Sequence, residues 1–90
     1  MKLVFTSRFE KDLLSIRDKA VKANVLAALV RLKRASRLDE AGDITKLKGS
    51  KNAFRLKVGN FRIGFYLTAD TITLTLGRFV DRKDIYRLFP

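Results

Sequence analysis

The stretch NAFRLKVGNFRIGFY, residues 52–66, decides the fold that we expect for this chain. Apolar and polar residues alternate on both sides of Gly59-Asn60, and an alternation of period two is typical of a β-strand. A Gly-Asn pair between two such runs is the signal for a two-residue hairpin turn. In the resulting register Val58 pairs with Phe61, and the apolar side chains of the hairpin lie on one face of the sheet.

The opposite face of this hairpin is basic. The same register places Lys57 directly opposite Arg62, with Arg55 one step away, and like charges that face each other destabilise a sheet. The usual fate of strand charges is a solvated outer face. Because no acidic residue lies nearby to balance the cluster, we interpret it instead as a binding site for an anion.

The composition also favours a polyanionic partner. The 90 residues make one small domain, 1–90, with 47% hydrophobic residues for a core and a net charge of +11 from 20 basic and 9 acidic residues. Such a balance favours nucleic acid, an anionic membrane or an acidic protein as the partner. The interval between Asp43 and Asp70 has no acid and six bases, which are Lys46, Lys48, Lys51, Arg55, Lys57 and Arg62.

Residue types that the sequence lacks exclude several kinds of site. The chain has no cysteine and no histidine, which excludes disulfides, thiolate metal sites, a histidine general base and a Ser-His triad. No apolar run approaches the ~18 residues of a membrane span, and the N-terminus lacks the apolar region of a signal peptide. We therefore expect a soluble, cytoplasmic protein with no membrane segment.

The residues before the hairpin predict one strand and two helices. Residues 1–5 read as a strand, and Ser7 to Glu10 has the spacing of a capping box, so a helix should begin after Ser7. Arg17-Asp18-Lys19 should end or bend it, and a second helix should run from about Val21 to Arg37. Their apolar stripes are Phe9, Leu13, Leu14 and Ile16, and then Val21, Val25, Ala28, Leu29 and Leu32.

The remaining segments complete the sheet and the tail. Residues 38–50 read as one loop, and the alternating run from Thr71 to Leu76 predicts a third antiparallel strand after a turn near Ala69-Asp70. The tail, residues 81–89, should form a short helical turn. The side chains that should be buried against the helices are Phe54, Leu56, Ile63, Phe65, Ile72 and Leu74.

This order of elements predicts an α+β fold. We expect an N-terminal strand, an antiparallel helical hairpin packed on one face of an antiparallel sheet, and a short C-terminal helical segment. The exposed side of the second helix is basic and includes Lys33 and Arg34. That side is either a solvated helix face or a second surface for nucleic acid.

The sheet face that the helices leave free should be suited to a phosphodiester. It should carry Tyr66 beside the three bases of the hairpin, and Arg78, Arg82 and Tyr86 follow in positions where they could converge on it. Arginine binds phosphate through two parallel hydrogen bonds, and tyrosine and arginine planes stack on bases. No cluster of acids on this face could hold a metal.

Four runs, taken in order, carry a resemblance that covers almost the whole chain. They are Leu47-Lys48-Gly49, Phe54 to Gly59, Phe61-Arg62-Ile63 and Arg82 to Arg87. Together they resemble the RelE/ParE toxin superfamily, and the RelE branch most closely. The resemblance implies a RelE-like fold and the toxin of a type II toxin–antitoxin system, a ribosome-dependent endoribonuclease that cuts messenger RNA in the A site without metal or cofactor. It also implies a hetero-oligomer with a cognate acidic, RelB-like antitoxin that holds the toxin inactive.

The resemblance also assigns roles to individual residues. The positions that match the family's catalytic residues are Arg55, Lys57, Arg62, Arg82 and Tyr86, with Arg78 as the alternative to Arg82. Arg55 differs from the family pattern, because the family often has lysine at this position. The further residues that we expect to contact the substrate are Lys51, Tyr66, Arg78, Lys33 and Arg34.

The implied reaction is attack of the ribose 2′-OH on its own phosphorus, with the 5′-oxygen leaving. A base must take the 2′ proton, cations must hold the phosphoryl charge, and an acid must protonate the leaving oxygen. Without histidine, the base is either Lys57, whose neutral form the facing Arg62 favours, or Tyr86. Two other functions stay open at this point: a ParE-like inhibitor of DNA gyrase with the same fold, and a non-enzymatic RNA-binding domain.

Overall fold

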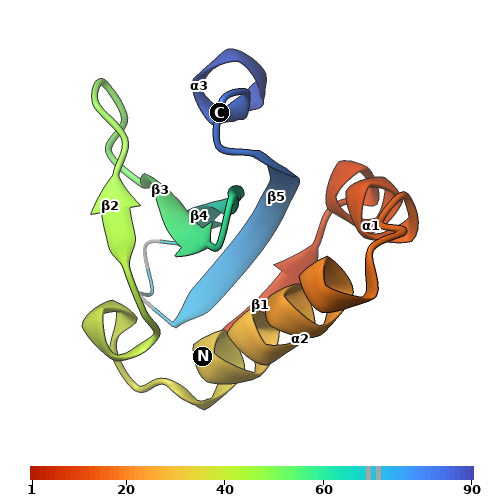
Figure 1. Cartoon of the computed structure of the whole chain (residues 1–90). Helices are drawn as coiled ribbons and strands as arrows, with labels where there is room; N and C mark the ends of the chain where they lie inside the picture. Colours follow the sequence, from red (N-terminus) through yellow and green to blue (C-terminus); the bar gives the residue numbers. More distant parts are fainter. Residues whose placement is uncertain (69, 71) are drawn as a thin grey trace.

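A five-stranded sheet with helices on both sides forms the frame of the molecule (Figure 1). The computed structural model describes residues 1–68, 70 and 72–90. In chain order the elements are β1 (Lys2–Phe5), α1 (Ser7–Leu14), α2 (Lys19–Arg34), the 3-10 turn η1 (Leu38–Glu40), β2 (Ile44–Lys46), β3 (Ala53–Val58), β4 (Phe61–Leu67), β5 (Thr73–Asp81) and α3 (Ile85–Leu88). The α+β class and the order strand, helix, helix, strands, helical tail are confirmed.

The hairpin of β3 and β4 has the expected register. Val58 pairs with Phe61, Lys57 with Arg62 and Leu56 with Ile63 in an antiparallel ladder. The strand order is β1-β5-β4-β3-β2, with β1 at one edge and parallel to β5 while the other pairs are antiparallel.

The edge strand β2 is a correction, because residues 38–50 were expected to be one loop. Ile44–Lys46 pairs antiparallel with β3 and has only three residues, which is too short for an alternation to be visible in the sequence. The segment is anchored by Leu47, which is buried, as the sequence indicates.

Both helices begin and end slightly earlier than the sequence predicts. The cap of α1 is Thr6 and not Ser7, because the Thr6 hydroxyl accepts a hydrogen bond from the Phe9 N–H at 3.2 Å. Asp18 caps α2 in the same way and so separates the two helices. The second helix ends at Arg34 because the Glu40 carboxylate accepts the next free N–H groups, which belong to Ser36 and Arg37.

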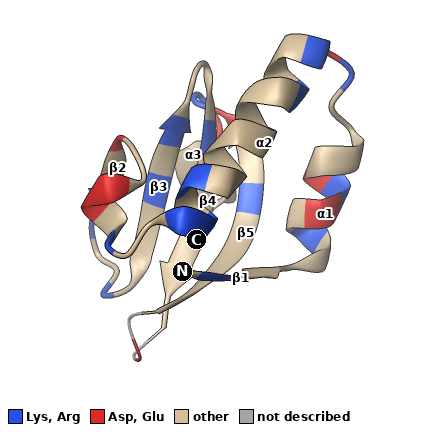
Figure 2. Cartoon of the chain, turned by 90° about the horizontal axis from the view of Figure 1, so that it is seen from below, with Lys and Arg blue, Asp and Glu red and all other residues tan. Residues whose placement is uncertain are grey.

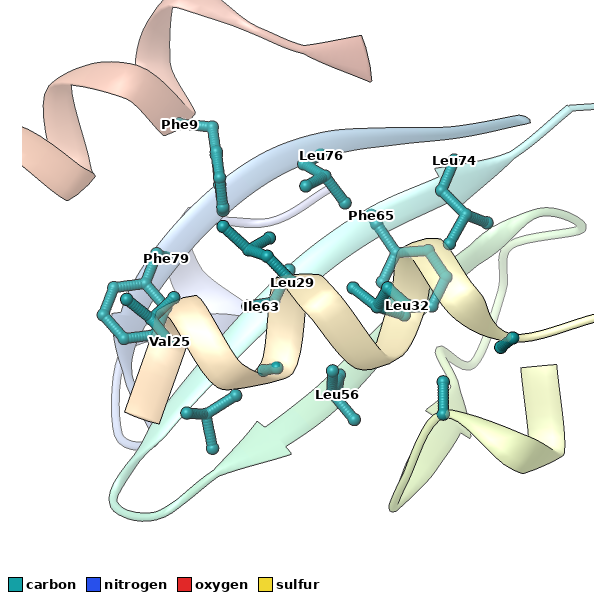
Figure 3. Packing of buried hydrophobic residues seen from close by; sticks show 14 residues of the cluster. Phe9, Val25, Leu29, Leu32, Leu56, Ile63, Phe65, Leu74, Leu76 and Phe79 are labelled. Atoms are coloured by element: carbon teal, nitrogen blue, oxygen red, sulfur yellow. The ribbon is translucent and has the colours of Figure 1, made fainter. Parts of the chain in front are cut away.

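The main core lies between one face of the sheet and the two long helices. Figure 3 shows side chains of α2 packed against those of the strands, with Phe9 of α1 at one end. Its fully buried members include Phe9, Val25, Ala28, Leu32, Leu56, Ile63, Phe65, Leu74 and Leu76. Four of the six residues predicted for this core, Leu56, Ile63, Phe65 and Leu74, are confirmed as buried.

Three other apolar residues differ from expectation. Phe54 is only half-buried, although its ring stacks on that of Phe65 at 5.6 Å. Ile72 is exposed because β5 begins at Thr73, two residues later than predicted, and it ends at Asp81 and not at Leu76. Leu14 is exposed because it is five residues after Phe9, and that spacing turns it away from the sheet. The predicted turn residue Ala69 and the predicted strand start Thr71 lie outside the described residues.

A second, smaller cluster lies on the opposite face of the sheet. Its buried residues are Leu47, Ala53, Val80, Ile85 and Phe89, with Tyr66 and Leu88 packed against them. The tail therefore folds onto the face that the two long helices leave free, as Figure 1 shows for α3. It brings Ile85 and Phe89 into contact with strands β3 to β5, as expected for the apolar side of the predicted helical turn.

Candidate nucleic-acid site on the outer face of the sheet

Four side chains gather on the sheet face opposite α2, and we call them the cationic face: Arg55 and Lys57 of β3, Arg62 of β4 and Tyr86 of α3. Strand alternation turns the three bases to this side, because their neighbours Leu56 and Ile63 are buried on the other. Figure 2 shows basic residues along β3, and acidic residues on α1, in the segment before β2, and in the segments just before β5 and α3.

Arg62 is a buried cation, with 9% of its surface exposed. Its Nη1 donates to the carbonyl oxygens of Gly59 at 3.0 Å and Phe61 at 2.9 Å, whereas its Nε is buried without a hydrogen-bond partner among the described residues. Within the described part of the chain Arg62 forms no ion pair. Burial of an uncompensated charge is costly, so this arrangement favours the arrival of an anion.

Arg55 and Tyr86 form the other half of the cationic face. The Arg55 guanidinium carbon lies 5.5 Å from the centre of the Tyr86 ring, and in the described part of the chain the buried Arg55 Nε has no hydrogen-bond partner. Tyr86 itself is 66% exposed. The guanidinium and the phenol therefore present adjacent planes, a geometry suited to stacking on a base beside a phosphate.

The structure separates the two candidate arginines of the last strand. Arg78 forms an ion pair with Asp12 of α1, with 2.9 Å between Nε and Oδ2, and the two side chains are 18% and 16% exposed. Its Nη2 also donates to Asp12 at 3.2 Å, and these hydrogen bonds raise the pKa of the Arg78 guanidinium. Arg82 is exposed, and its backbone N–H donates to the Asn60 carbonyl in the hairpin turn. Arg82, at the hairpin end of the sheet, is therefore the better candidate for the cationic face.

Sequence reasoning missed Asp12, although a signal was present. Asp12 lies on the same side of its helix as Phe9 and Leu13, where an apolar residue is the norm. A carboxylate in that stripe indicates a partner on the element against which the helix packs. Here the partners are Arg78 and the backbone N–H of Phe79, at 2.8 Å from Oδ2.

The other expected substrate contacts are more dispersed. Tyr66 lies on the outer face, but its ring packs on Phe89 with 4.9 Å between ring centres, so it is half-buried. Lys51 is exposed in the segment between β2 and β3. Lys33 and Arg34 are exposed on α2, which packs on the other face of the sheet, so the structure does not bring them to the cationic face.

The described residues contain neither a cluster of possible metal ligands nor a helix that could span a membrane. No three acidic side chains come together there in a way that could hold a metal ion. Of the helices in the described ranges, none is long and apolar enough to cross a membrane.

Comparison with known proteins gives a consistent set of relatives. No family model matches the chain. It is 34% identical to the toxin RelE3 of Methanocaldococcus jannaschii over the full length of both chains. Its structure is similar to the crystal structure of the RelB–RelE antitoxin–toxin complex from Methanococcus jannaschii, with a TM-score of 0.77, 31% identity and coverage of 97% of this chain and 99% of that one.

More distant structures share the fold. The RelE–RelB complex of Pyrococcus horikoshii matches with a TM-score of 0.73 at 19% identity, over 93% of this chain and 97% of that one. The isolated RelE toxin of E. coli matches with a TM-score of 0.69 at 19% identity, over 96% of this chain and 90% of that one. With a full-length relative at 34% identity, the expected relationship is confirmed, and the chain belongs to the RelE family of toxins.

Proposed function

We propose that this chain is a metal-independent endoribonuclease that cuts messenger RNA in the A site of the ribosome and thereby inhibits translation. The observation that carries the proposal is the cationic face, where Arg62 is buried without an ion-pair partner among the described residues and lies opposite Lys57. A cation that the fold holds in place is a preorganised partner for charge that develops on phosphoryl oxygens. Membership of the RelE family supports the same function.

The proposed reaction divides the chemical roles among these residues. The ribose O2′ forms a bond to the adjacent phosphorus while the bond from phosphorus to O5′ breaks, which leaves a 2′,3′-cyclic phosphate and a 5′-OH. Arg55 and Arg62 hold the negative charge of the phosphoryl oxygens, with Arg82 approaching from the end of β5. Tyr86 stacks on a base or exchanges a proton, and one proton leaves O2′ as another reaches O5′.

Lys57 and Tyr86 are the two candidates for the general base. Lys57 is exposed and directly opposite Arg62, so its amine can reach a phosphodiester bound between them. Tyr86 is exposed beside Arg55 and offers the competing group. Lysine and tyrosine side chains are in general poor bases at neutral pH. An enzyme with such groups depends on its substrate being held in position, which the ribosome would supply.

We further propose that an acidic, RelB-like antitoxin binds this chain and holds it inactive in a hetero-oligomer. The similar toxins of Methanococcus jannaschii and Pyrococcus horikoshii are bound by RelB in their crystal structures. A net charge of +11 favours an acidic partner. Both the antitoxin and the ribosome would be met in the cytoplasm.

The decisive experiment uses purified chain and ribosomes that carry a defined message with an empty A site. We expect single cuts in the A-site codon, with a 2′,3′-cyclic phosphate or 3′-phosphate on one product and a 5′-OH on the other. Treating the toxin with a chelator before it meets intact ribosomes should leave the rate unchanged. Products with a 5′-phosphate, or activity that returns only with added metal, would contradict the mechanism.

The same preparation separates the other functions. An uncut message together with inhibited supercoiling by DNA gyrase would indicate a ParE-like inhibitor. An uncut message that is nevertheless bound would indicate a non-enzymatic RNA-binding domain. In cells, expression of the chain alone should arrest growth, and co-expression of the antitoxin should relieve the arrest.

A further inference from the structure

Two glycines lie side by side in the middle of the sheet, on the outer face of β4 and β5. Gly64 pairs with Arg78, and Gly77 is the neighbour of Arg78 in β5. Neither glycine has a backbone φ in the left-handed region, so backbone conformation does not require glycine at either position. Glycine weakens a strand interior and often marks a place where another group approaches closely.

The group that approaches is the ring of Phe89. A Cβ on Gly64 would lie 2.5 Å from the Phe89 ring, and a Cβ on Gly77 would lie 2.7 Å from it. The Tyr66 ring flanks the same position, with its centre 4.9 Å from that of Phe89. We call the space above Gly64 and Gly77 the glycine slot; the ring that fills it is 3% exposed.

The glycine slot lies next to the cationic face. Gly64 is the direct pairing partner of Arg55 in β3, and Arg55 lies against the ring of Tyr86. Tyr86 and Phe89 are three residues apart in the tail, and the Phe89 N–H donates to the Ile85 carbonyl at 2.8 Å, so one hydrogen-bonded turn connects them. The position of the Phe89 ring therefore helps to determine where Tyr86 lies.

The tail has few other means of holding Tyr86. The helix α3 has only four residues, and a helix of that length is not stable by itself in water. Tyr86 is mostly exposed, so its own contacts cannot fix it. Its place must come from the two anchors on either side, which are Ile85 in the smaller core and Phe89 in the glycine slot.

We propose that Phe89 is a positioning residue of the site: its ring, seated on Gly64 and Gly77, holds Tyr86 against Arg55 in the arrangement that cleavage needs. This inference rests on the proposed function for its kinetic consequences. The two glycines are part of the same arrangement, because a Cβ at either position would occupy the space of the Phe89 ring. Phe89 touches neither substrate nor reacting atoms, and it acts only through Tyr86.

The kinetic test uses single-turnover cleavage of ribosome-bound message by the full chain. Phe89→Ala and Gly77→Ala should each lower the rate on the order of 10²-fold, the cost typical of a misplaced catalytic group, with ribosome affinity unchanged within about twofold. In the Tyr86→Ala background, Phe89→Ala should have almost no further effect. Leu14→Ala, at an exposed apolar position on α1, is the control and should keep the full rate. Losses from Phe89→Ala and Tyr86→Ala that multiply would overturn the proposal.

A second measurement tests the positioning without any ribosome. In the wild-type chain, nuclear Overhauser effects should connect the Tyr86 ring protons with the Arg55 side chain. Phe89→Ala and Gly64→Ala should abolish them and leave the contacts of Ile63 in the main core intact. Persistence of the Tyr86–Arg55 contact in both variants would refute the role of Phe89. If the wild type cleaves no message, the proposed function fails, and this measurement alone decides on the positioning.

Discussion

Removal of the Asp12 carboxylate should be one of the most costly single changes outside the apolar core. Asp12 accepts hydrogen bonds from Nε and Nη2 of Arg78, at 2.9 and 3.2 Å, and from the backbone N–H of Phe79, at 2.8 Å. It thereby ties α1 to β5. In Asp12→Ala, the Arg78 cation and the Phe79 N–H both lose their acceptor.

The size of the effect follows from the burial of the pair. Breaking a fully buried ion pair by removing one partner costs about 3–5 kcal/mol. The side chains of Arg78 and Asp12 are 18% and 16% exposed, so water can partly solvate the Arg78 guanidinium that has lost its partner in Asp12→Ala. We therefore expect a loss of about 2–3 kcal/mol in the free energy of unfolding. The pair between Arg37 and Asp39 has a similar length, 3.1 Å, but is mostly exposed, and its loss should cost only about 0–1 kcal/mol.

Urea denaturation at pH 7 can compare the two carboxylates directly. Asp12→Ala should move the midpoint far more than the matched control Asp39→Ala, with the same dependence on denaturant. A double-mutant cycle with Arg78→Ala should show strong coupling, because the second change relieves the stranded cation. If Asp12→Ala and Asp39→Ala cost the same, or if the losses at Asp12 and Arg78 simply add, the ion pair is not the link that the geometry indicates.

Three further predictions concern the core and the bases. Phe65→Ala should lower the free energy of unfolding by about 3–5 kcal/mol in the same denaturation assay, because the ring is fully buried against α2. Arg62→Ala should slow single-turnover cleavage by roughly 10²–10³-fold with little change in ribosome binding, and equal losses of both would reduce the cationic face to a docking surface. Lys33→Ala and Arg34→Ala should instead weaken ribosome binding and flatten its dependence on salt, without a change in the rate of the bound complex.

The hairpin could be predicted because its signals are local and agree with each other. The alternation on each side of Gly59-Asn60 and the turn residues themselves specify one register, and a shift by one residue would turn Phe65 and Ile63 toward water. The register then fixes which bases face one another, so the sequence alone places Lys57 opposite Arg62. The order of the elements indicated only that Tyr86 could converge on this face, and the family resemblance assigned it a catalytic role.

The features that sequence reasoning missed depend on contacts between distant segments. The short strand β2 has too few residues for a periodic pattern. Ile72 belongs to the alternating pattern in the sequence, but it lies just before the first residue of β5. The seat of Phe89 joins residues from β4, β5 and the tail, and nothing near Gly64 or Gly77 in the chain indicates which ring will lie above them. Such contacts are set by packing, which propensity and period do not encode.

Two arginines with similar degrees of burial have opposite roles, and the acids around them make the difference. Arg78 meets the Asp12 carboxylate, so its charge is neutralised and it serves to fasten α1 to the sheet. Arg62 is still more buried, and among the described residues its guanidinium meets only carbonyl oxygens, so no carboxylate there compensates its charge. A fold selected for stability alone would pair or replace such a cation, because an unpaired buried charge is unfavourable. An unpaired buried cation opposite the like charge of Lys57 is the arrangement expected if this face binds the phosphodiester of the proposed substrate.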